Sequence, residues 1–465
     1  MRTYQTILRQ ARPLAIVLVV TTAFAGCSEE QSIDLTPETL EKFAALEGMQ
    51  QSTSEPLRRH YDLLVAEKTT PLDLRKPALT PEQNVAAVFD ALFSKSFLSQ
   101  QLEKSAEMFP RPRFDVDTKL LERIILFRRR LEPQRSKVAA ALSRPQCDFG
   151  LDPARGWYAD ASILDAATVY VRLEAFLAAE RLSENDLAAA ADAVKRMFHM
   201  VGLLSNEMDV RARLLAGNLR EEALSVLSAT LHHMAADETT AREFYHVIEN
   251  QLAHWPNDAD AWIGDRARNL VSYEAVRKEA LFTLLTEPEL RRMMLNHRSK
   301  NLNATAAEGA DSDQLFYLDE MQKILASCNK EEAEGRQPVP YFMRRHFFVD
   351  LVKAQQRKIE AGEFPLVAAE MFLPHMQQGH ALQAADRART EMWSLALAIS
   401  LDMPPTKYEL SPVSGQKYHV AAEPRNVVVT AYGNEDSSGN QSTAWSEAVV
   451  VPRFVNAAKR SARRP

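Results

Sequence analysis

The densest group of side chains that could bind a metal lies between residues 232 and 254. It consists of histidines and glutamates: His232, His233, Glu238, Glu243, His246, Glu249 and His254. Glu243 and His246 form an ExxH element, whose spacing puts both side chains on one face of a helix. Di-iron bundles combine two such elements with two further glutamates. The sequence contains only one ExxH. It therefore predicts no metal and no cofactor, with His232, Glu243 and His246 as the weak candidates for a metal site.

A second pattern with chemical meaning is Ser327-Cys328-Asn329-Lys330, which fits SxxK. Penicillin-binding enzymes use this spacing to place a lysine amine beside a nucleophilic serine, together with SDN and KTG elements that this sequence lacks. The sequence also contains no GxSxG, HExxH, P-loop or GxGxxG motif. These observations favour a non-catalytic protein and predict no catalytic residue. A hydrolase or metal-dependent enzyme of an unrecognised type stays as an alternative.

The composition favours long helices as the elements that position these side chains. Glycine is rare, at 14 of 465 residues, and residues with high helix propensity fill long stretches. Thr36-Pro37 has the N-cap and first-turn proline of a helix start, and Thr80-Pro81-Glu82-Gln83 has the arrangement of a capping box. Pro133 is expected to kink or split the helical pattern of residues 117–142. The predicted fold is mainly α, a multi-helix array of antiparallel helix pairs with a small C-terminal β ribbon.

The β ribbon is predicted where the pattern changes after residue 403. β-Branched runs indicate strands at Val427–Tyr432 and Ala448–Val451, joined by a loop. A two-stranded ribbon is marginally stable in water, so we expect it to pack on the helices. Breaks in the periodicity divide the chain into an N-terminal helical region, a central helical domain, a C-terminal helical region, a β unit and a basic tail: 36–143, 144–300, 301–403, 404–455 and 456–465.

The N-terminal segment has the features of an export signal. Arg2, Arg9 and Arg12 precede the uncharged run Leu14–Gly26, which would rise only about 20 Å as a helix, whereas crossing a bilayer takes ~30 Å. Phe24-Ala25-Gly26-Cys27 resembles a bacterial lipobox. We therefore expect residues 1–26 to be removed as a lipoprotein signal peptide and Cys27 to carry the lipid, palmitate included, at the start of a tether of residues 27–35. A plain secretory signal or an uncleaved anchor is the alternative.

Charge and cysteine usage limit the partners of the chain. The net charge of −6 argues against nucleic acid, because phosphate contacts need a positive field. Ser28 after the lipobox cysteine favours the outer membrane, so we expect attachment through the lipid on Cys27 at its periplasmic face.

An exported compartment permits a disulfide between Cys147 and Cys328, and two separately buried thiols are the equal alternative. The sequence does not identify a protein partner.

Two parts of the sequence resemble known proteins. Residues 187–231 and 253–277, with Gly264-Asp265-Arg266-Ala267, are similar to uncharacterised exported proteins of planctomycete-type bacteria. The C-terminal ribbon, with Ser411–Gly415 and Val429–Gly433, resembles the C-terminal ends of type II secretion pseudopilins. The first resemblance implies export without a known activity, and the second implies an accessory role in a secretion or pilus-like assembly. Some pseudopilins bind calcium in this last loop. Here Glu435 and Asp436 are its only carboxylates, too few for calcium's 6–8 oxygen ligands.

Taken together, these patterns predict a lipid-anchored cell-envelope protein that acts as a non-catalytic scaffold or binding module. The alternatives are an envelope enzyme of unrecognised type and an accessory protein of a secretion or pilus-like assembly.

Overall fold

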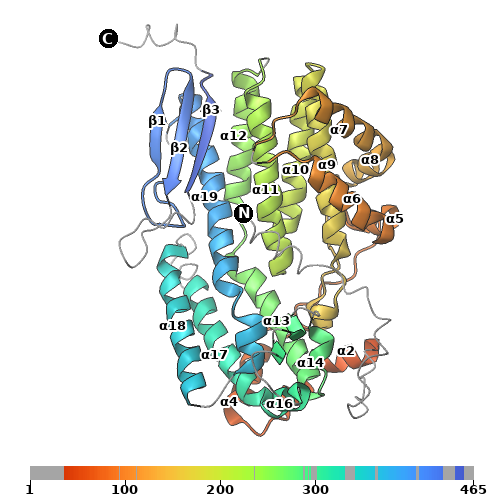
Figure 1. The fold of residues 1–465 in the computed structure, drawn as a ribbon, viewed down its shortest axis with the longest axis vertical. Helices are drawn as coiled ribbons and strands as arrows, with labels where there is room; N and C mark the ends of the chain where they lie inside the picture. The colour runs from red at the N-terminus through yellow and green to blue at the C-terminus, as the bar shows by residue number, and fades with distance from the viewer. Residues whose placement is uncertain are drawn as a thin grey trace.

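The computed structural model describes residues 36–93, 95–111, 113–234, 236–285, 289–291, 293–294, 301–329, 341–361, 365–404, 408–432 and 446–454. These residues form a mainly α fold with a small C-terminal sheet, which confirms the predicted fold class (Figure 1). Among them, none of the helices combines the length and the apolar character that a membrane crossing requires. Cys27, the predicted signal peptide and tether, the loop with Glu435 and Asp436, and the basic tail lie outside the described residues.

The helices form two tiers that are joined by one long helix, α19 (Met376–Ser400) (Figure 1). The upper tier contains α5 (Ala87–Leu92), α6 (Lys95–Met108), α7 (Thr118–Arg130), α8 (Glu132–Ala141), α9 (Ser162–Ser183), α10 (Leu187–Ser205), α11 (Val210–Leu231) and α12 (Glu238–Ala253). The lower tier contains α2 (Pro37–Ala44), α3 (Glu47–Gln50), α4 (Glu55–Ala66), α13 (Asp258–Arg277), α14 (Leu281–Leu284), α16 (Leu302–Glu308), α17 (Ala310–Asn329) and α18 (Tyr341–Glu360). The short elements η1 (Pro153–Tyr158) and η2 (Ala368–Phe372) precede α9 and α19.

Each tier has its own cluster of buried hydrophobic side chains. The upper cluster begins at Val85 and takes in α5–α12, the C-terminal half of α19 and the sheet, whereas the lower cluster combines α2–α4 with α13, α14 and α16–α18. The predicted regions 36–143 and 144–300 therefore each contribute to both clusters. The first helices of the chain contact one another and also α13 and α17, which come much later in the sequence.

The two cysteines of the described chain belong to different clusters. Cys147 packs against the upper cluster, and Cys328 is buried in the lower one. No disulfide joins them. The packing of the two tiers places the thiols in different clusters, with Cys328 buried and Cys147 half-buried. The predicted Cys147–Cys328 bond therefore stays a prediction that this structure does not contain.

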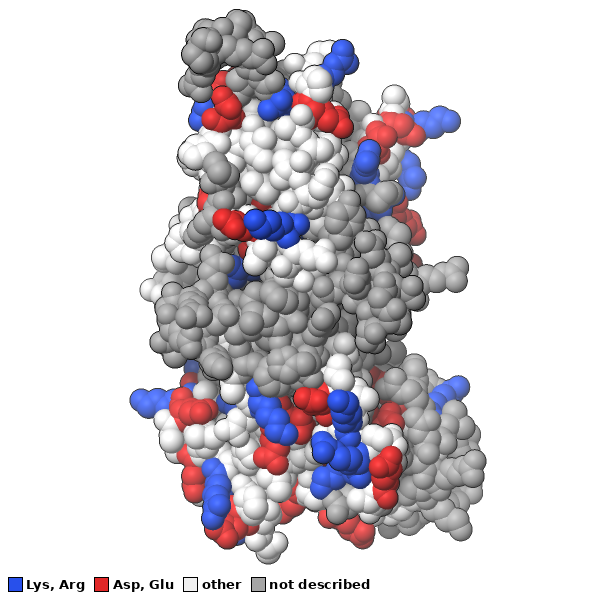
Figure 2. Space-filling model, turned by 90° about the vertical axis from the view of Figure 1, so that its left-hand side faces the viewer, with Lys and Arg blue, Asp and Glu red and all other residues white. Residues whose placement is uncertain are grey.

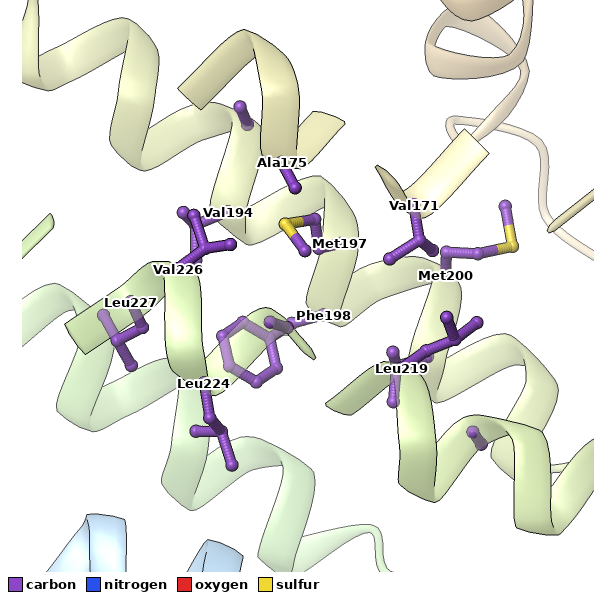
Figure 3. Close-up of a cluster of buried hydrophobic side chains, with 14 of the residues drawn as sticks. Val171, Ala175, Val194, Met197, Phe198, Met200, Leu219, Leu224, Val226 and Leu227 are labelled. Atoms are coloured by element: carbon purple, nitrogen blue, oxygen red, sulfur yellow. The ribbon is translucent and has the colours of Figure 1, made fainter. Parts of the chain in front are cut away.

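The centre of the upper tier is α9, which is buried on all sides. Every residue from 166 to 180 is buried, as expected for a helix surrounded by other helices. Its Ala175 lies by Met197 of α10 and its Val171 by Met200, and Phe198 points toward Leu224 of α11 (Figure 3). These contacts fix the rotation of α10, and hence the direction in which its polar residues point.

The C-terminal sheet has three antiparallel strands in the order β1 (His419–Ala422), β2 (Asn426–Tyr432) and β3 (Ser446–Pro452). The predicted strands at 427–432 and 448–451 are confirmed, and β1 is an addition. Val427 pairs with Val451 and Val429 with Val449, and all four side chains are buried. The sheet packs on α19, where the Tyr418 hydroxyl donates a hydrogen bond to Glu391 Oε2 (2.7 Å).

Three predicted helix boundaries had different outcomes. Thr36 caps α2, accepting a hydrogen bond from the amide of Thr39 (3.2 Å), and Pro133 lies at the start of α8 directly after α7, as predicted. The prediction that residues 80–83 form a capping box at a helix start was wrong. The neighbouring residue Val85 donates a backbone hydrogen bond to Gln146 O (2.9 Å) across a short bridge, so α5 begins only at Ala87.

Candidate functional site

A cleft of about 600 Å³ lies between α10 and α12, with Arg220 of α11 contributing to its lining. Ligand pockets commonly have volumes of this order. The lining residues are Lys195, Phe198, His199, Gly202, Leu203, Ser205, Asn206, Arg220, His246, Val247, Asn250, Gln251, His254 and Pro256. Every titratable side chain among these described residues is a cation or an imidazole.

The walls of the cleft are two helices with well-defined starts. Asp186 caps α10 by accepting a hydrogen bond from Ala189 N (3.1 Å), and Asp237 caps α12 through Thr240 N (2.9 Å). Phe198 is almost fully buried in the upper cluster and its carbonyl accepts a hydrogen bond from Gln251 Nε2 (3.5 Å) across the cleft. The polar lining is therefore carried by helices whose positions depend on the core.

Two permanent cations line the cleft, and each is bonded to carboxylates. Lys195 Nζ lies 2.8 Å from Glu243 Oε2 and 3.4 Å from Asp192 Oδ1, and the hydrogen bond with Glu243 raises the pKa of Lys195. Arg220 is 2% exposed; it donates hydrogen bonds to Asp386 of α19 and to Ser205 Oγ (2.8 Å). Its guanidinium also lies 4.5 Å from the ring centroid of Trp255.

Three exposed imidazoles, those of His199, His246 and His254, complete the charged part of the lining. His199 comes from α10, where burial lowers its pKa. His254 ends α12, and its Nδ1 lies 3.0 Å from Asn250 O. Because a carbonyl oxygen only accepts, Nδ1 carries the proton, and Nε2 is an acceptor when the ring is neutral.

The outer face of the sheet and α18 has a different distribution of charged side chains from the cleft. There, acidic and basic side chains are interspersed over the described part of the surface (Figure 2). By contrast, no carboxylate is among the described residues that line the cleft. Glu243 and Asp386 form ion pairs with the lining residues Lys195 and Arg220.

The predicted metal candidates are not brought together. His232 is exposed at the end of α11, where its Nδ1 bonds to Ser228 O (2.8 Å), and Glu243 is bonded to Lys195. Only His246 lines the cleft. In the described parts of the chain there is no group of three or more histidines, cysteines and carboxylates that could hold a metal ion. The sequence pattern did not reveal His199, Lys195 or Arg220, since they reach the cleft from two other helices.

A second concentration of ionisable side chains is buried where α11 and α13 meet, around Asp209. Asp209 bonds to Arg211 (2.8 Å) and to Arg268, and both guanidinium groups lie 5.4 Å from the ring centroid of Trp157. The Trp157 indole in turn donates to Asn269 Oδ1 (2.7 Å). These groups bond to one another inside the protein, which is the arrangement of a structural network.

Asp265 in this network gives a prediction for the pH dependence of stability. Burial raises the pKa of Asp265 to about 6, against about 3.9 in an unfolded chain. Between these values the folded state keeps a proton that the unfolded state has released, so stability falls as the pH rises from about 4 to 6. Asp265→Asn removes this loss. It is expected to raise the free energy of unfolding by about 2 kcal/mol at neutral pH and to leave it nearly unchanged near pH 4.

The measurement is urea unfolding of the wild type and Asp265→Asn at several pH values, followed by circular dichroism. A constant difference between the two proteins across the pH range would contradict the expectation.

Comparisons with known proteins found no matching family model, curated protein or solved structure.

Proposed function

We propose that this protein is a lipid-anchored, non-catalytic binding module of the cell envelope, and that the cleft between α10 and α12 takes its ligand. The cleft is the observation that carries the binding part of the proposal. It is concave, about 600 Å³ in volume, and combines donors such as Lys195 and Gln251 with the half-buried apolar side chains of Leu203 and Val247. Polar groups that converge in such a cleft from packed helices are typical of binding sites.

The location rests on the N-terminal sequence. A basic start, a short apolar run and Cys27 in a lipobox-like context support removal of residues 1–26 as a signal peptide and acylation of Cys27, for example with palmitate. Acyl chains stabilise attachment by about 0.8 kcal/mol for each methylene buried in the bilayer. We therefore propose that the lipid on Cys27 attaches the protein to the outer membrane at its periplasmic face.

Mass spectrometry of the mature N-terminus tests the location. The expected product starts at residue 27 and carries acyl chains, and globomycin, which blocks lipoprotein signal peptidase, should make the uncut precursor accumulate. Cys27→Ala is expected to abolish acylation, whereas Cys147→Ala should leave it intact. A purified chain that still begins with Met1, or an unmodified residue 27, would refute the proposed anchor.

Native mass spectrometry of the full chain, incubated with a small-molecule extract of the envelope, tests the cleft. Asn250 is exposed on α12 and lines the cleft, so Asn250→Trp should fill it. Arg242→Trp places the same bulk on the exposed surface of α12 outside the lining. We expect a bound species in the wild type and in Arg242→Trp that is lost in Asn250→Trp. Equal retention in all three proteins would place binding elsewhere.

A further inference from the structure

We propose that the cleft between α10 and α12 is a pH-dependent anion site that takes a small ligand with a phosphate or carboxylate group. This inference rests on the proposed binding function and names the chemical class of its ligand. The inference follows from a comparison between the charges near the cleft that are fixed and the side chains whose charge changes with pH.

The fixed charges of the cleft largely cancel. Lys195 faces Glu243 of α12 and Asp192 of its own helix, and buried Arg220 of α11 faces Asp386 of α19. Arg213 of α11 also donates to the carbonyls of the lining residues Ser205 and Pro256, and it is paired with Asp258. Carboxylates ordinarily stay ionised above about pH 5, so the pairs keep their charges through the neutral range. The field that an entering anion meets is therefore set by the remaining titratable groups.

The remaining titratable groups are the imidazoles of His199, His246 and His254. Imidazole is the side chain that ordinarily gains its charge between about pH 8 and 5. All three side chains are exposed, so they can meet a ligand and solvent together. Each ring that takes up a proton adds positive charge to the cleft, which favours an anion. Burial lowers the pKa of His199, so His199 gains its charge only at a lower pH.

A hydrogen bond of His254 gives a second reason why protonation should favour the binding of an anion. Its Nδ1–H is engaged by Asn250 O at 3.0 Å, so the neutral ring offers only the lone pair of Nε2. That lone pair repels the oxygen of a phosphate or carboxylate. Protonation converts Nε2 into a charged donor, and charge-assisted hydrogen bonds to anionic oxygens are stronger than neutral ones.

Neutral donors complete the lining. The side-chain amides of Asn206, Asn250 and Gln251 can donate to anionic oxygens at any pH. Leu203 and Val247, which are half-buried, offer apolar contact to the rest of a ligand. A phosphate ester or an organic acid has both features. The arrangement thus fits an organic anion better than a bare ion.

Isothermal titration calorimetry on the full chain in a neutral detergent tests the inference. Sulfate stands in for a phosphate group and oxalate for a carboxylate, and both keep a constant charge between about pH 6 and 8. Any pH dependence of the dissociation constant then arises from the protein and not from the anion. We expect binding of at least one anion to be about tenfold or more tighter near pH 6 than near pH 8, and the tighter anion identifies the class.

The variants separate the cleft from other histidines. His199→Gln/His246→Gln/His254→Gln keeps exposed, polar side chains and should abolish the pH dependence. His232→Gln/His233→Gln removes two histidines outside the lining and should preserve it. Two results would overturn the inference: binding of neither anion near pH 6, or a pH dependence that survives in the triple variant. If an envelope extract still yields a ligand that Asn250→Trp excludes, the binding function stands and only the anion class fails.

Discussion

Replacing Asp209 with asparagine is expected to lower the free energy of unfolding by about 3–5 kcal/mol, because it removes one side of a buried ion pair. Asp209 and its partner Arg268 are both 0% exposed. The Asp209 carboxylate also bonds to Arg211 Nη2 at 2.8 Å. Without the carboxylate, the buried Arg268 guanidinium would lose its bonded counter-ion and keep only the longer-range attraction of Asp265.

The substitution isolates the charge from the helix cap. Asp209 also caps α11 by accepting hydrogen bonds from Arg211 N (2.7 Å) and Ala212 N (3.3 Å), and asparagine caps a helix about as well as aspartate. Asp237→Asn is the matched control, since Asp237 caps α12 in an exposed position. We expect it to change stability by less than about 1 kcal/mol. Equal losses in the two variants would show that the buried charge pair is not the cause.

The pH dependence of this difference provides a second check. Burial alone would raise the pKa of Asp209, but the guanidinium groups of Arg211 and Arg268 outweigh burial and hold the pKa well below its usual range. The unfolded chain takes up this proton near pH 4, so the contribution of the pair is complete above that pH and is lost as the pH falls further. Urea unfolding should therefore show a full difference between wild type and Asp209→Asn at pH 7 and a smaller one in acid.

Local sequence signals predicted most of the fold. Thr36 and Pro133 mark helix boundaries because capping and the missing proline amide act within one turn. The strands at 427–432 and 448–451 were also visible, since their valines form continuous β-branched runs. The Thr80 capping box failed because a bridge to Gln146, far away in the sequence, determines the backbone there.

The site and the interior were less predictable, because both depend on contacts between distant helices. His199 and His246 reach one cleft from α10 and α12, and Arg220 meets Asp386 of α19, 166 residues away. Buried charges also break the rule that polar residues face water. Arg172 and Glu174 lie inside the fold on α9, where Arg172 bonds to Glu222 and Glu174 to Arg135 and Arg196. No periodicity in a single helix reveals such pairs.

Gly264→Ala is expected to cost at least about 3 kcal/mol of stability, which is the upper range for overpacking. A Cβ at Gly264 would lie 1.8 Å from the carbonyl oxygen of Met208 and 2.7 Å from its carbonyl carbon. These atoms belong to the backbone between α10 and α11, so no side-chain rotation relieves the clash. Either α13 or this turn must move.

The control for Gly264→Ala is Gly309→Ala, at the end of α16. There the nearest atom to a new Cβ is Thr305 O at 3.5 Å, and φ is −88°, which alanine adopts readily. We expect a change within about 1 kcal/mol, and any gain would come from the reduced entropy of the unfolded chain. Thermal and urea unfolding of both variants provide the comparison. If Gly264→Ala unfolds at the same temperature and urea concentration as the wild type, α13 does not approach the turn as closely as the structure shows.

The two largest effects should also be coupled, because Gly264 and Arg268 lie one turn apart on the same face of α13. Gly264 meets Met208, and Arg268 bonds to the next residue, Asp209. A helix displaced by the new methyl group would already have weakened the ion pair. The double variant Gly264→Ala/Asp209→Asn is therefore expected to lose less stability than the sum of its single variants, by more than about 0.5 kcal/mol. Strict additivity would mean that the close approach and the buried pair stabilise the fold independently.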